Sequence, residues 1–141
     1  MDTTHVDIID KTIEKTNAWI NELAAELGTD DRLYAYRVLR AFLHTLRDGL
    51  SVDEAAQLAA QLPQLIRGLY YEGWDPSKTP QKYRHPTEFL ERVAKEAGLH
   101  GPTEASHAAA AAARVLYGHV SEGELSDVFQ LLPHEIRVML Q

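Results

Sequence analysis

The feature of this sequence that most limits its fold is an internal repeat with an offset of 70 residues. At that offset residues 19–71 align with residues 89–141 without a gap, and about 12 of the 53 aligned positions are identical, against about three or four expected from residue frequencies alone. Alanine-rich helices can align by composition, but composition does not place Ser, Gly and Pro in register. The chain is therefore predicted to contain two copies of one structural unit. Among the identical pairs are Gly28 with Gly98, Ser51 with Ser121, Glu54 with Glu124, Pro63 with Pro133, and Arg67 with Arg137.

The first copy opens with the pattern of a long amphipathic helix. This helix is predicted from about residue 6 to residue 27, and it stops at Gly28, which suits the left-handed conformation of a helix end. Ile9, Ile13 and Trp19 recur near one face of the helix, at the spacing of a core-facing stripe. We therefore expect all three side chains to be buried.

A second helix is predicted after Thr29 and Asp30, two residue types that cap helix starts well. The matching helix of the second copy carries an unbroken run of alanine at residues 108–113. Alanine favours the helix and has almost no side-chain bulk, so a neighbouring helix can approach closely there. We expect this run at the centre of the molecule. The expected core stripe of the second helix is Tyr36, Leu39, Leu43, Leu46 and Leu50.

Capping and proline signals mark two shorter helices in each copy. The third helix begins with a Ser-x-x-Glu capping box, in which each side chain bonds the backbone amide of the other residue. A Leu-Pro step then ends the third helix and begins the fourth. In each copy an arginine lies in the second turn after the Leu-Pro step, and its side chain is expected to reach an acidic residue of the same copy. The residues with these structural roles are Ser51, Glu54, Pro63 and Arg67 in the first copy and Ser121, Glu124, Pro133 and Arg137 in the second.

No segment of useful length alternates between apolar and polar residues, so the fold class is predicted to be all-α. The chain has 141 residues, of which 45% are hydrophobic, and one core can hold a chain of this size. We expect a single helical bundle over residues 1–141, built from two tandem pseudo-repeats of about three to four helices each. Their expected bounds are about 6–71 and 88–141, joined by a crossover loop at about 72–87.

Composition and charge exclude several classes of protein. The chain has no cysteine, which rules out disulfides and cysteine-ligated metal centres. It shows no signal peptide and no membrane-spanning run, so we expect a cytoplasmic protein without membrane contact. The net charge of −7 disfavours nucleic acid as a partner. Residues 1–31 hold eight acids and two lysines, whereas residues 32–50 hold four arginines and one acid, and these two blocks are expected to pair within the molecule.

A basic stripe follows the second predicted helix at spacings of three and four. Three interpretations compete. The stripe is a solvated or ion-paired face that meets first-helix acids such as Glu22 and Glu26, a docking surface for an acidic partner, or a helix that tracks nucleic-acid phosphates. The second copy does not double the charge, which disfavours the last interpretation. The members of the stripe are Arg37, Arg40, His44 and Arg47.

The expected crossover loop combines aromatic and basic side chains. Such a mixture can hold an anion, stack a planar ligand or form an interaction hot spot. The competing structural interpretation is that the aromatic rings are buried and that the cations pair with acids close by in the sequence. The residues singled out here are Trp74, Lys78, Lys82, Tyr83, Arg84 and His85.

Some of the same residues carry a family resemblance. Residues 68–74 (Gly-Leu-Tyr-Tyr-Glu-Gly-Trp), 82–85 (Lys-Tyr-Arg-His) and 88–90 (Glu-Phe-Leu), together with the two Leu-Pro steps, resemble family 2267 of the domains of unknown function. This is a group of small, mostly prokaryotic proteins. The resemblance covers close to the whole chain and implies a helical, duplicated domain. It implies no reaction.

The sequence offers no catalytic set. The chain has seven histidines, and the nearest approach to a di-iron pair is Glu104 with His107, which lacks the second pair that such a site needs. The serines are expected in caps, in the loop or within helices without a base nearby, and no glycine-rich phosphate loop is present. We therefore expect no enzyme, no metal and no cofactor.

The function predicted from the sequence is that of a protein-interaction or regulatory module with an unknown protein partner. Alternatives are a binder of a small anionic or planar ligand at the crossover loop, and a weak nucleic-acid binder through Arg37, Arg40 and Arg47. Self-association into a homodimer is a further hypothesis. Its expected surface is the last helix, where Ile136, Met139 or Leu140 would be exposed.

Overall fold

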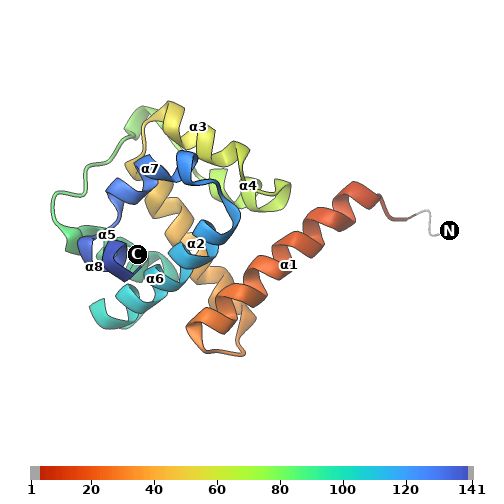
Figure 1. Ribbon diagram of the computed structural model, residues 1–141, viewed down its shortest axis with the longest axis horizontal. Coiled ribbons are helices and arrows are strands. Elements are labelled where there is room, and N and C mark those ends of the chain that lie inside the picture. Colours follow the sequence, from red (N-terminus) through yellow and green to blue (C-terminus); the bar gives the residue numbers. More distant parts are fainter. Residues whose placement is uncertain (1–3, 140–141) are drawn as a thin grey trace.

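The computed structural model describes residues 4–139, and these residues form helices without any strand (Figure 1). The all-α prediction is therefore confirmed for the part of the chain that the structure describes. A single 3-10 turn, η1, lies between the fourth and fifth α-helices. The α-helices are α1 (Asp7–Leu27), α2 (Arg32–Gly49), α3 (Val52–Ala60), α4 (Gln64–Tyr71), α5 (Pro86–Ala97), α6 (Pro102–His119), α7 (Glu122–Leu131) and α8 (His134–Met139), and η1 spans Pro76–Lys78.

The turn between α1 and α2 follows the predicted signals with one shift. Gly28 ends α1 in the left-handed conformation, with a φ of 70°, as expected for a residue without a Cβ. The cap of α2 is Asp31, whose carboxylate accepts a hydrogen bond from the Tyr34 amide at 3.1 Å, rather than Thr29 or Asp30. Thr29 instead accepts the Asp31 amide at 3.1 Å and so shapes the turn that precedes the cap.

The capping box at the start of α3 is confirmed. The Ser51 amide donates to Glu54 Oε1 at 2.9 Å, and the Glu54 amide donates to Ser51 Oγ at 3.2 Å. Pro63 is the N-cap of α4, as its predicted role at the start of the fourth helix requires. Ser121 takes the N-cap position of α7, but the side chain of Glu124 lies outside the described residues.

The core is organised around α2 and α6. Helix α2 contacts α1, α4, α5, α6 and α7, so it lies in the middle of the molecule. The alanine run 108–113 of α6 is completely buried, which confirms its predicted central position. Small side chains there let α1, α2 and α5 pack closely against α6.

The N-terminal half of α1 departs from the predicted core. Ile9 is 53% exposed and Ile13 is 44% exposed, whereas Trp19 is buried. Figure 1 shows the reason, because α1 extends past the body of the molecule toward the N-terminus. The buried part of α1 begins at Trp19. A third expected core residue, Tyr36, is 39% exposed, because it lies at a surface cavity between α1, α2 and α4.

The last helix is also packed differently from the prediction. Ile136 is fully buried, because α8 packs against α6. The prediction that Ile136 forms an exposed surface for self-association is therefore wrong. The side chain of Met139 and residue Leu140 lie outside the described residues.

The membrane prediction rests on helix length and hydropathy. Within residues 4–139, no helix combines the length and the apolar character that crossing a bilayer requires.

The alanine run generates a stability prediction. Ala110→Leu adds bulk where two helices already touch, so we expect the free energy of unfolding to fall by about 1–3 kcal/mol. Chemical denaturation monitored by circular dichroism measures the change. Ala56→Leu makes the same change at an exposed position of α3 and should stay within about 0.5 kcal/mol of the wild type. Equal stability of all three proteins would contradict the close packing.

Candidate functional site

The basic stripe of α2 is divided between the surface and the interior. Arg37 is exposed, whereas His44 and Arg47 are only 4% and 3% exposed. The stripe is therefore not the solvated face that its spacing suggested, because α4 and the segment that follows it cover its C-terminal part.

The buried part of the stripe holds the end of α4. Arg47 Nη1 donates to the carbonyl oxygens of Tyr70 at 2.9 Å and Glu72 at 2.8 Å. His44 Nε2 lies 2.7 Å from the carbonyl oxygen of Leu69, and burial lowers the pKa of His44 against the opposing effect of that contact. The last carbonyls of a helix lack partners within the helix and carry its negative dipole end, so side-chain N–H donors satisfy them well, above all a cationic one such as Arg47. These residues therefore have a structural role.

The acidic block of α1 pairs with α6 rather than with the stripe. Glu22 lies 2.7 Å from Nε2 of His119, and Glu26 lies 3.6 Å from Nη1 of Arg114. The predicted pairing of these two acids with α2 is wrong, because the edge of α1 that carries them faces α6. His119 also stacks on Trp19 with a centroid separation of 4.5 Å.

A buried carboxylate joins α2 to α5. Asp48 Oδ1 accepts a hydrogen bond from Nε of Arg47 at 2.8 Å, and Asp48 Oδ2 accepts one from Nη2 of Arg92. Burial would raise the pKa of Asp48, but the hydrogen bonds and charges of the two arginines outweigh it and hold that pKa below its ordinary value. The ion pair between Asp48 and Arg92 therefore links α2 to α5 inside the protein.

The segment between α4 and α5 is anchored by its aromatic residues. The Tyr83 hydroxyl donates to the carbonyl oxygen of Thr45 at 2.7 Å, and its ring packs edge-on against Phe89. A Cβ at Gly49 would lie 2.8 Å from the Tyr83 ring, so glycine is required at that contact. Trp74 packs against Tyr71 with ring centroids 5.2 Å apart.

The basic residues of the same segment point outward. Lys78 makes a long ion pair with Asp75 at 3.8 Å, and the backbone amide of Arg84 donates to Glu88 at 2.9 Å. Five surface cavities with volumes of about 320–390 Å³ are lined by other residues. The remaining exposed residues of the predicted loop site are Lys82 and His85.

The two arginines after the Leu-Pro steps have different surroundings. Arg67 donates to the carbonyl oxygens of Ala59 at 2.8 Å and Leu62 at 2.9 Å, so it closes the end of α3. The prediction that it reaches an acidic residue is therefore wrong, because its partners are backbone carbonyls. Nε of Arg137 is buried without a hydrogen-bond partner among the described residues.

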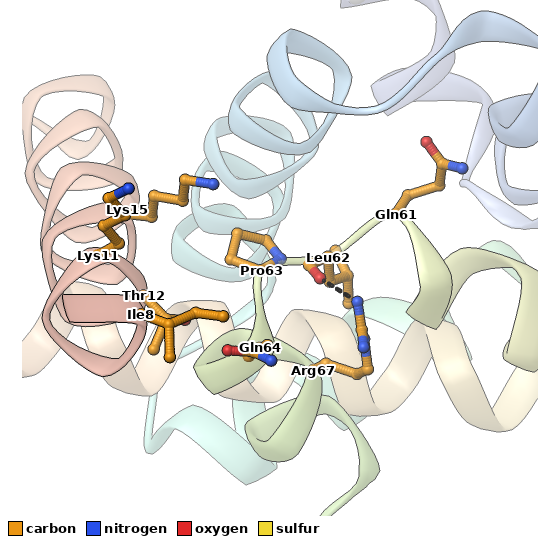
Figure 2. Close-up of a pocket in the computed structure, with 9 residues that line it drawn as sticks. All are labelled: Ile8, Lys11, Thr12, Lys15, Gln61, Leu62, Pro63, Gln64 and Arg67. Atoms are coloured by element: carbon orange, nitrogen blue, oxygen red, sulfur yellow. Dashed lines mark hydrogen bonds between the residues drawn. The ribbon is translucent and has the colours of Figure 1, made fainter. Parts of the chain in front are cut away.

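The best candidate for a functional site is a groove that the sequence did not reveal. It lies between the N-terminal half of α1 and the corner where α3 meets α4, with a cavity volume of about 390 Å³ (Figure 2). The Leu65 amide donates to Thr12 Oγ1 at 3.0 Å and fixes the distance between the two walls. The residues that line the groove are Ile8, Lys11, Thr12, Lys15, Gln61, Leu62, Pro63, Gln64 and Arg67.

The groove beside the N-terminal half of α1 is lined by basic side chains. Lys11 and Lys15 lie on the α1 wall and Arg67 lies on the opposite wall, as Figure 2 shows. None of the residues lining this cavity is acidic, although the whole chain carries a net charge of −7. The two lysines are four residues apart and share one helix face. They are the only lysines of an otherwise acidic block, and that contrast was the available sequence signal.

The groove continues along α1. A second cavity shares Lys15, Gln61 and Pro63 with the first and reaches Trp19 and His119. A third shares His119 and extends to the ion pairs of Glu22 and Glu26 described above. One side of α1 therefore borders a shallow channel that is basic near the N-terminus and holds both acidic and basic side chains toward the C-terminus of α1.

Glu104 and His107, the nearest approach to a metal-ligand pair in the sequence, each contact other parts of the chain. Among the side chains that the structure describes, no group of three or more histidine or acidic residues is placed to hold a metal ion. Glu104 accepts a hydrogen bond from the Tyr34 hydroxyl at 3.2 Å, and His107 lies 3.5 Å from the Leu27 carbonyl.

Asp48 gives a prediction for the pH dependence of stability. Its pKa is lower in the folded than in the unfolded chain, so its contribution is present at neutral pH and is lost as the pH falls below about 4. Asp48→Asn should cost about 3–5 kcal/mol at pH 7, because it leaves the buried Arg47 without its carboxylate. The difference in unfolding free energy between wild type and variant should shrink as the pH is lowered.

The exposed Asp30→Asn variant is the control, and denaturant titrations at several pH values make the measurement. A difference between wild type and Asp48→Asn that stays constant down to pH 3 would contradict this account of the carboxylate.

Comparison with known protein families gives a match over most of the chain. Residues 16–139 match the family described as an uncharacterized conserved protein (DUF2267). Among curated proteins, none matches the chain. The family match begins at Thr16 and so includes most of the helices, but it leaves out the part of α1 that carries Lys11 and Lys15. Because it covers most of the chain, the protein belongs to the DUF2267 family.

Proposed function

We propose that this protein is an interaction module that binds an acidic, apolar-faced segment of a partner protein in the groove beside α1. The observation that carries the proposal is the combination of Lys11, Lys15 and Arg67 around one cavity that no acidic residue lines. Exposed Ile8 adds apolar surface at the same place. Amphipathic helices commonly bind in grooves of this kind, with apolar anchors inside and charges at the rim.

The shape of the channel supports an elongated occupant. The α1 residues that border it recur at spacings of three and four, from Ile8 through Lys15 to Glu22, which is one side of a helix. A partner segment lying along α1 would place its acids near the lysines at one end. At the other end the channel is lined by Glu22 and Glu26, whose negative charge disfavours an acidic segment, so the attraction would favour one orientation of the segment.

The groove replaces the α2 stripe as the surface for an acidic partner. Two of the four stripe residues hold the end of α4 and are not accessible. A ligand at Trp74, Lys78, Lys82, Tyr83, Arg84 or His85 and nucleic-acid binding through Arg37 and Arg40 stay predictions.

We also propose that the chain is one domain of two tandem pseudo-repeats. In support, α2 and α6 each have 18 residues, and Arg32 and Pro102 at their starts differ by the repeat offset of 70. The starts of α3 and α7, and of α4 and α8, differ by the same offset. A single cluster of buried residues draws on both halves.

Site-specific photocrosslinking tests the groove. Benzoylphenylalanine in place of Ile8 should capture, in the source cells, a protein whose crosslinked segment is acidic. Combining it with Lys11→Glu and Lys15→Glu should remove the adduct, because the charge that attracts the segment is reversed. Binding of the mapped peptide to the purified wild type should weaken at least about tenfold in the charge-reversed variant, and it should weaken with added salt.

The control places the same crosslinker at Val138, an exposed apolar residue of α8. Both lysines are exposed, so circular dichroism should show unchanged folding of the variant. An adduct that survives charge reversal, that forms equally from Val138, or whose mapped segment is not acidic would overturn the proposal.

A further inference from the structure

The N-terminal half of α1, called the α1 arm below, carries on another side an exposed apolar surface that does not line the groove. Ile9 and Ile13 are four residues apart and share one face of α1, and Val6 is the extended N-cap residue just before the helix. All three are between 44% and 56% exposed. Leu65 and Tyr36 are exposed to a similar degree, at 48% and 39%. These five residues are called the apolar strip below.

The strip is continuous across three helices. A cavity of about 330 Å³ is lined by Thr16 of α1, Tyr36 of α2, and Leu65 and Leu69 of α4. Thr16 follows Ile13 by three residues and so continues the same face of α1. The hydrogen bond from the Leu65 amide to Thr12 holds α4 beside the arm. Clustered apolar exposure of this kind marks an interaction surface more often than scattered exposure does.

Charge is arranged with opposite signs at the two ends of the strip. Asp10 and Glu14 lie on α1 next to Ile9 and Ile13. At the α2 end, Arg37 is exposed next to Tyr36, and Arg40 pairs with Glu72 at the rim of the cavity. Among the described residues of one copy, no ion pair joins these acids to these arginines, and Asp10 contacts His5 instead.

We propose that the apolar strip binds a second copy of this chain and forms a two-fold symmetric dimer. With the axis near Ile13 and Leu65, the acidic end of one strip faces the basic end of the other. Such an isologous contact uses the same patch on both copies. It buries the apolar residues and brings Glu14 of one copy toward Arg37 of the other. The surface differs from the C-terminal helix expected from the sequence, where Ile136 is buried.

Sedimentation equilibrium on the full chain tests the dimer. At micromolar concentrations the wild type should have about twice the chain mass of 15.8 kDa. Ile9→Glu with Ile13→Glu should raise the dissociation constant at least about tenfold, because it places charge inside the contact. Val52→Glu is the matched control, since Val52 is exposed to nearly the same extent as Ile13 but lies on α3, and it should leave the dimer intact.

Charge exchange makes the test specific for the proposed geometry. Glu14→Lys and Arg37→Glu should each weaken the dimer, and the two together in one chain should restore it. Lys11→Glu with Lys15→Glu should leave it unchanged, which separates this proposal from the groove. A monomer at all concentrations, a dimer that resists the isoleucine changes, or a double charge variant weaker than either single variant would overturn the proposal.

Discussion

The fold depends on the burial of α2, because a helix enclosed by five others must have every polar group along it satisfied. Arg47 meets this constraint in two directions, since it bonds the Asp48 carboxylate and two carbonyls at the end of α4. Asp48 in turn reaches Arg92 of α5 and, through its carbonyl oxygen, the backbone amide of Gln81 at 2.6 Å. One short polar network therefore fixes the positions of α4, α5 and the segment between them.

Both candidate surfaces exist because α1 is longer than the part of it that the neighbouring helices cover. Helix α1 has 21 residues, and α2 and α6 bury it only from Trp19 onward. The remaining part of α1 is supported by α4 through the Thr12 and Leu65 contact. A helix that extends beyond its neighbours has two accessible sides, and here one side is basic and the other is apolar. The proposed groove and the proposed dimer contact both arise from this one feature.

Much of the local structure could be predicted because its causes are local. Gly28 at the end of α1, the capping box of Ser51 and Glu54, and Pro63 at the start of α4 all behave as their residue types require. The buried alanine run was predictable for a related reason, since a long stretch without bulk is useful only where helices touch. The predicted burial of Ile9 and Ile13 was wrong, because a helical pattern identifies an apolar face but does not show whether another helix covers it.

The candidate site was harder to predict than the fold. Arg47 and Arg37 belong to one stripe in the sequence, yet one is buried and the other is exposed, because α4 covers only part of α2. The sequence by itself determined the helical class, most of the predicted helix ends and the family, since these depend on residue types at short spacings. Only the tertiary structure decided which charged residues became internal ties and which faces stayed open, because that depends on which distant helices meet.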